Sequence, residues 1–166
     1  MQQKQLLYIY YDIGNIPVIA NQFNYNVISC SINDINIECI NYFDLIWVDI
    51  PHNYDDIWEN YADILTVLSI IEYSNPANYV ITMFKNNNIE NKWFMYGLSY
   101  KDVKSIEYGA MYEKNLRVYS NIKSWNNLIA MPWRYQRLPP GLKRRRFDYR
   151  YIVPVMLIIE ILENII

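Results

Sequence analysis

Asp49 is the side chain whose type and position most clearly suggest chemistry. It comes near the end of a short apolar run, residues 44–50 (DLIWVDI), and Pro51 follows that run. In sheets of parallel strands, ligands bind at the carboxyl ends of the strands, so an acid there can orient a ligand or a reacting hydroxyl. The same carboxylate could instead cap the following loop or helix. Both interpretations of Asp49 stay open at this stage.

The turn after the first apolar run (residues 6–11) is the second place where a ligand could bind. A cofactor loop at this point needs several glycines, because the backbone must approach the cofactor closely. Residues 12–17 (DIGNIP) hold one glycine, two bulky isoleucines and a proline that lacks an N–H donor. We therefore expect a degenerate cofactor loop without tight binding, whose remaining candidate contacts are Asp12, Gly14 and Asn15.

A basic segment, residues 134–150, is the third candidate. Its cations alternate with aromatic residues, which suits RNA because cations meet phosphates and rings stack on bases. A docking strip for an acidic protein partner and a plain solvated surface are the alternatives. The candidate RNA or partner contacts are Arg134, Arg137, Lys143, Arg144, Arg145, Arg146 and Arg150.

Composition excludes several other classes of function. The chain has two cysteines, one histidine and a net charge of -2. We therefore expect no metal site, no disulfide framework and no overall polyanion binder. We see neither a signal peptide nor a long apolar run, and we expect a cytoplasmic protein without membrane contact. Abundant Asn, Ile and Tyr, all with A/T-rich codons, suggest an AT-rich genome such as that of a virus, plasmid or parasite.

The elements that must position these residues form an α/β pattern of short apolar strands and amphipathic helices. Such alternation favours a mainly parallel sheet covered by helices, with a closing antiparallel strand pair. We expect a first domain at residues 1–130, and at 131–166 the basic segment with an apolar C-terminal helix packed on that domain. The expected strands are 6–11, 27–31, 44–50, 78–84, 103–108 and 116–120, and the expected helices are 55–73 and 92–99.

A family resemblance emerges from the order and content of these elements. Residues 78–120 (NYVITMFKNNNIENKWFMYGLSYKDVKSIEYGAMYEKNLRVYS) resemble the matching part of cap 2′-O-ribose methyltransferases. They look closer still to the small, non-catalytic subunit of the poxvirus-type mRNA-capping enzyme, itself a degenerate methyltransferase fold. The resemblance covers roughly residues 6–125 and implies a Rossmann-like, methyltransferase-type sheet.

The catalytic residues that the resemblance implies are only partly present. The acid is present as Asp49. The position of the catalytic lysine holds Thr82, and Lys85 follows three residues later. The position of the glutamate holds Asn115, with Glu113 two residues before it. One matching residue of three, together with the poor cofactor loop, favours a pseudoenzyme.

Our leading hypothesis is a non-catalytic regulatory subunit of a viral or plasmid-type mRNA-capping complex. It would form a heterodimer with a larger catalytic subunit and stimulate it, without a cofactor of its own. One alternative is an active S-adenosylmethionine-dependent cap 2′-O-methyltransferase that uses Asp49, Lys85 and Glu113. Another is an RNA-binding module that uses the basic segment.

Overall fold

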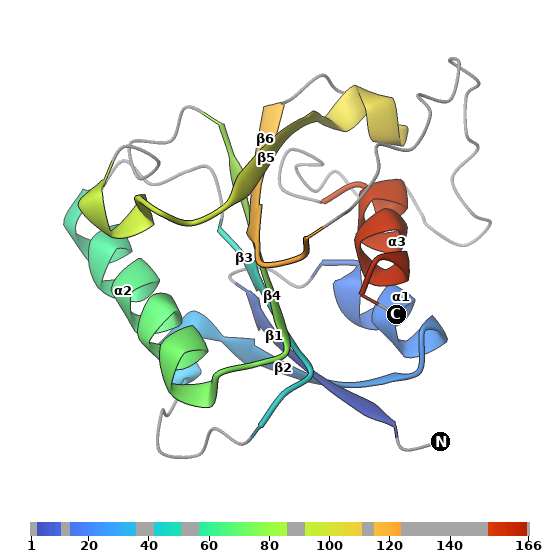
Figure 1. Cartoon of the computed structure of the whole chain (residues 1–166), viewed down its shortest axis with the longest axis horizontal. Coiled ribbons are helices and arrows are strands. Elements are labelled where there is room, and N and C mark those ends of the chain that lie inside the picture. Colours follow the sequence, from blue (N-terminus) through green and yellow to red (C-terminus); the bar gives the residue numbers. More distant parts are fainter. Residues whose placement is uncertain are drawn as a thin grey trace.

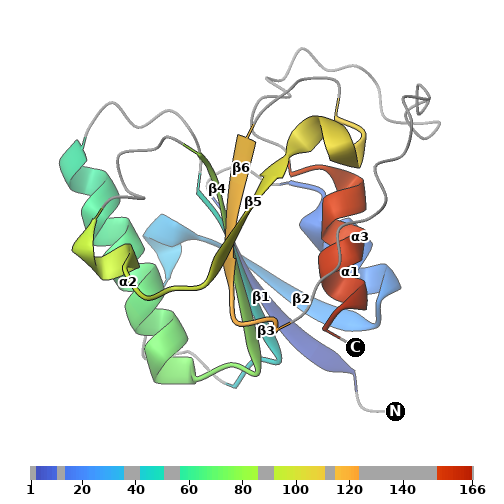
Figure 2. The ribbon, with the colours of Figure 1, turned by 45° about the horizontal axis from the view of Figure 1, so that its top comes forward.

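The computed structural model describes residues 3–10, 14–35, 42–50, 57–85, 92–110, 115–123 and 153–165. These residues form an α/β structure with one six-stranded mixed sheet and three α-helices. The sheet stands between helices, with α2 on one face and α1 and α3 on the other (Figure 1). The turned view shows the same three layers (Figure 2).

The sheet has the strand order β2-β1-β3-β4-β6-β5. The four strands β2, β1, β3 and β4 are parallel, and β6 runs antiparallel to both of its neighbours. From β1 the chain moves outward to β2 and then returns past β1 to β3, so its direction of travel reverses between β1 and β3. The strands are Lys4–Tyr10 (β1), Tyr25–Ser31 (β2), Leu45–Asp49 (β3), Asn78–Phe84 (β4), Tyr100–Lys104 (β5) and Asn115–Ser120 (β6).

Each face of the sheet has its own apolar core, because successive side chains of a strand point to opposite faces. The helices are Ile16–Gln22 (α1), Ile57–Ser74 (α2) and Val155–Glu163 (α3). On the face of α1 and α3, the buried strand residues include Leu6, Leu45 and Val80. On the face of α2, Ile9, Val48 and Ile81 pack with the helix. The strands β1, β3 and β4 are thus buried on both faces, which explains their continuous apolar sequences.

The strand predictions are mostly confirmed. The expected strands at 44–50 and 78–84 are β3 and β4, which pair in parallel as inner neighbours. The antiparallel pair at the end of the sheet is β5 and β6. The expected strand at 103–108 begins earlier, because β5 spans Tyr100–Lys104 and Ser105–Tyr108 is a 3-10 turn.

One predicted helix is absent, and one observed helix was not predicted. The helix expected at 92–99 is wrong: only Trp93–Met95 is helical there, as one 3-10 turn. Conversely, α1 was not predicted. Its proline lies in the first turn, where a missing N–H costs no helical hydrogen bond. The expected C-terminal helix is α3, which starts after Pro154 and packs beside α1.

Candidate functional site

Four side chains meet near the carboxyl ends of β1, β3 and β4, on the face that α1 and α3 cover. Trp47 and Asp49 are two residues apart in β3, so they point to the same face. Parallel pairing sets Tyr8 of β1 opposite Trp47, and Thr82 of β4 opposite Asp49. The strand register therefore brings three polar side chains around one carboxylate.

The Asp49 carboxylate accepts hydrogen bonds from all three neighbours. The Tyr8 hydroxyl donates to Oδ2 at 2.8 Å, and the Trp47 indole N–H donates to Oδ1 at 3.2 Å. The Thr82 hydroxyl also donates to Oδ1. A carboxylate has about four acceptor positions, so the chain itself fills most of them.

Burial changes the proton affinity of this cluster. It raises the pKa of Asp49 to about 6, although the hydrogen bonds from Thr82, Tyr8 and Trp47 favour the charged form. Burial and the adjacent carboxylate raise the pKa of the Tyr8 phenol well above its usual range. The phenol therefore stays protonated and remains a donor to Asp49. A carboxyl group that titrates near neutral pH could act in proton transfer if a substrate reached it.

Gly14, two residues before α1, lies against this cluster. The Gly14 N–H donates to the Tyr8 hydroxyl at 3.3 Å. A Cβ atom on Gly14 would lie 2.9 Å from that hydroxyl oxygen and 3.7 Å from Asp49 Oδ2. The Tyr8 side chain is fully buried. The single glycine of the turn thus lets the backbone approach a side chain of the same chain.

Lys85 lies elsewhere. It lies three positions after Thr82, and an odd spacing in an extended chain places two side chains on opposite faces. The Lys85 ammonium group forms an ion pair with Asp102 of β5 at 2.8 Å. Arg117 of β6 binds the same carboxylate at 2.7 Å and 3.0 Å. The two cations, chiefly Arg117, lower the pKa of Asp102. The structure therefore brings Lys85 to a surface ion-pair network and not to Asp49.

The other predicted site residues divide into two groups. Gly14 and Asn15 lie at the start of α1, and the Asn15 side chain makes no capping hydrogen bond. Asn115 opens β6, where its carbonyl oxygen accepts a hydrogen bond from the Lys85 N–H. Asp12, Glu113 and all seven basic residues of 134–150 lie outside the described residues.

Sequence reasoning found Asp49 but missed Tyr8 and Trp47 as its partners. The aromatic run of residues 6–11 was interpreted only as a buried strand. Its alternation contains the missing signal, because Tyr8 shares a face with Leu6 and faces Trp47 across the pairing. A buried tyrosine and a buried tryptophan usually bind a polar partner, and Asp49 is the acid at that strand end.

Wider comparisons add no family assignment. No model of a known protein family matches the sequence, and no curated protein matches it. Within the described ranges, no three His, Cys, Asp or Glu residues cluster as a metal site would require. No helix in that part of the chain combines the length and apolar character needed to cross a bilayer.

Proposed function

We propose that this chain is a non-catalytic regulatory subunit of a viral or plasmid-type mRNA-capping complex, with a degenerate methyltransferase-type sheet. It would form a heterodimer with a larger catalytic subunit and stimulate it. The observation that carries the proposal is that side chains of the same chain occupy most of the hydrogen-bonding positions of the Asp49 carboxylate. The acid that a cap 2′-O-methyltransferase would use is bound by Tyr8, Trp47 and Thr82 of the same chain.

The strand arrangement supports the Rossmann-like part of the proposal. Four parallel strands have helices on both faces, and an antiparallel strand closes the sheet. The chain direction reverses between β1 and β3, and open α/β sheets bind ligands at such a point. Asp49 ends β3 and Tyr8 lies near the carboxyl end of β1, so the expected cofactor position coincides with the Asp49 cluster.

The proton-transfer machinery supports the non-catalytic part. In the methyltransferases that the chain resembles, a lysine beside the acid lowers the pKa of a ribose hydroxyl. Here the strand position opposite Asp49 holds Thr82, whose neutral hydroxyl cannot supply that charge. Lys85, the lysine nearest to Thr82 in the sequence, forms an ion pair with Asp102. A shift of register that would bring Lys85 to Asp49 would also turn every apolar side chain of β4 to the wrong face.

Calorimetry and a methyl-transfer assay test the non-catalytic part. The purified chain should bind no S-adenosylmethionine at micromolar concentrations and transfer no methyl group to capped RNA. Micromolar binding that is lost in Asp49→Ala would establish the enzyme alternative and refute the proposal.

Co-expression tests the regulatory part. The chain should co-purify with the catalytic methyltransferase subunit of the capping enzyme encoded by the same genome, and it should increase that subunit's rate of methyl transfer. A subunit must bind the active conformation of its partner more tightly than the inactive one to do so. A catalytic subunit that neither co-purifies with this chain nor changes its rate would overturn the proposal. Tight binding of capped RNA by the chain alone would favour the RNA-binding alternative.

A further inference from the structure

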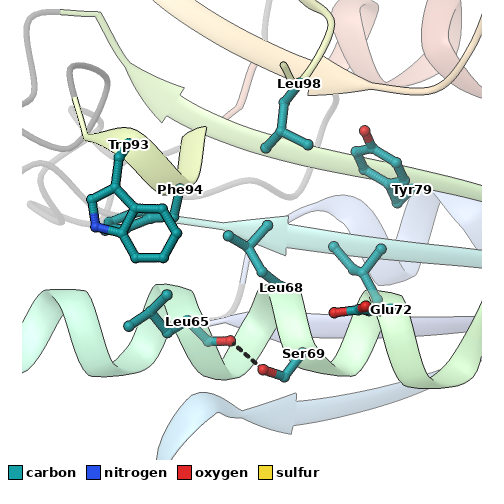
Figure 3. Close-up of a pocket in the computed structure, with 9 residues that line it drawn as sticks. Leu65, Leu68, Ser69, Glu72, Tyr79, Trp93, Phe94 and Leu98 are labelled. Carbon is teal, nitrogen blue, oxygen red and sulfur yellow. Dashed lines mark hydrogen bonds between the residues drawn. The ribbon is translucent and has the colours of Figure 1, made fainter. Parts of the chain in front are cut away.

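An apolar groove lies on the opposite face of the sheet from Asp49, between α2 and the segment that connects β4 to β5. Figure 3 shows Leu65, Leu68, Ser69 and Glu72 along α2, with the side chains of the connecting segment and of β4 facing them. The groove has a volume of about 390 Å³. Its lining residues are Leu65, Leu68, Ser69, Ile71, Glu72, Tyr79, Trp93, Phe94 and Leu98.

Large apolar side chains of this groove are exposed to water. Trp93 is 74% exposed and packs edge to face against Phe94, and Leu65 is 39% exposed. The Ser69 hydroxyl donates to the Leu65 carbonyl oxygen of its own helix. It therefore needs no hydrogen-bond acceptor from a ligand. Exposed apolar patches often mark interaction sites, and tryptophan is among the residues that contribute most to the binding energy of protein interfaces.

Glu72 gives one end of the groove a negative charge. Among the residues that the structure describes, it is the only charged one that lines the groove, and it makes no ion pair with any of the others. It also lies in the last turn of α2, where the helix dipole is negative and no basic residue is present. Glu72 and the C-terminal turn of α2 therefore favour a cationic group at this end of the groove.

The shape of the groove favours a helix. The lining residues of α2 are separated by three and four positions, so they form one ridge that spans two turns of helix. From Leu65 to Glu72 this ridge is about 10 Å long at 1.5 Å per residue. A second helix can lie beside such a ridge at the usual interaxial distance and insert its own apolar side chains between Trp93 and α2.

We propose that this groove binds an amphipathic helix of a protein partner that presents apolar side chains to Leu65 and Trp93 and a Lys or Arg to Glu72. The inference rests on the proposed regulatory function, because it supplies the surface through which such a subunit would bind its partner. The surface of the partner that contacts this groove would be apolar, with a cation at one edge. The Asp49 cluster takes no part in it.

Fluorescence anisotropy with two labelled synthetic peptides tests the proposal on the full chain. One peptide is an amphipathic helix of Leu and Lys, and the other has the same apolar face with Glu in place of Lys. The Leu/Lys peptide should bind the parent chain, and the Leu/Glu peptide should bind at least about ten-fold more weakly. Glu72→Lys should reverse this order, whereas Glu107→Lys, a change at an exposed acid of a different turn, should preserve it.

Two apolar variants test the groove itself. Leu65→Asp and Trp93→Ala should each weaken binding of the Leu/Lys peptide by about ten-fold or more, as expected for central interface residues. Val18→Asp is the matched control, because Val18 is exposed at 64% on α1. Since Trp93 is largely exposed, its variant keeps the test valid should Leu65→Asp fail to fold. Circular dichroism reports whether each variant is folded.

Several outcomes would overturn the proposal. Equal binding of both peptides, or unchanged binding by Trp93→Ala and Leu65→Asp, would exclude the groove as their site. A concentration-dependent dimer that Leu65→Asp converts to a monomer would show that a second copy of the chain occupies the groove. Binding of oligouridylate that depends on Trp93 would assign the surface to RNA.

The regulatory proposal and the groove can fail separately. Suppose the catalytic subunit co-purifies with the chain and the groove variants leave that complex intact. The groove proposal then fails while the regulatory function stands. If the Leu/Lys peptide binds as described but no capping subunit co-purifies, the groove stands and the regulatory function fails.

Discussion

Asp49→Asn should change how the stability of this protein depends on pH. Burial raises the pKa of Asp49 from its ordinary 3.8 to about 6 in the folded state. Between these two pH values the folded chain binds more protons than the unfolded chain, so the free energy of unfolding falls as the pH rises. Each tenfold change in proton affinity is worth about 1.4 kcal/mol, so the full shift is worth about 3 kcal/mol. About 2.4 kcal/mol of this is lost between pH 4 and pH 7.

The asparagine variant resembles the protonated acid, because it is neutral and keeps a carbonyl oxygen for Trp47 and Thr82. We therefore expect Asp49→Asn and the parent to have similar free energies of unfolding at pH 4. At pH 7 the variant should be more stable by up to about 2.4 kcal/mol. The difference between the two proteins isolates Asp49, because Asp102, whose pKa is lowered by Arg117 and Lys85, contributes equally to both.

Urea unfolding followed by far-UV circular dichroism at several pH values from 4 to 7 measures this difference. Asp34→Asn serves as the control, because Asp34 is exposed and its substitution should change stability by about 0.5 kcal/mol or less. A difference between Asp49→Asn and the parent that does not vary with pH would refute the reasoning. So would a variant that is less stable than the parent at pH 7, since the charged form of Asp49 would then be the favoured one.

Two further predictions concern the β1 turn and the basic segment. Gly14→Ala should lower the free energy of unfolding by about 1–3 kcal/mol, because its Cβ would lie 2.9 Å from the buried Tyr8 hydroxyl. Tyr8→Phe in the same chain should reduce that loss, and an equal loss in both backgrounds would contradict the contact, as judged by urea unfolding. Replacing Arg144, Arg145 and Arg146 with Ala should lower the salt dependence of RNA binding by about 2 in the slope of log K against log salt, if RNA is the ligand. If a protein partner is the ligand, the same change should abolish co-purification, and a triple variant that binds both like the parent would leave the segment only a solvated surface.

Strand identity and the position of the acid were predictable from the sequence because they depend on local pattern. Residues 44–50 and 78–84 are short, apolar and rich in β-branched residues, and such runs form buried strands in most contexts. Asp49 was found as a candidate because it lies near the end of the first of these runs. The region at 92–99 shows the limit of local pattern. Its apolar residues predict a helix, but only Trp93–Met95 forms a 3-10 turn, and Trp93, Phe94 and Leu98 line the groove beside α2.

The neighbours of Asp49 were decided only by the tertiary structure. Tyr8 precedes it by 41 residues and Thr82 follows it by 33, and their contacts depend on the order and register of three strands. Register is a property of paired strands, since a shift by one residue moves each side chain to the opposite face. For the same reason Lys85, close to Thr82 in the sequence, binds Asp102. The sequence by itself therefore determined where an acid ends a buried strand, whereas strand pairing determined that a tyrosine, a tryptophan and a threonine surround it.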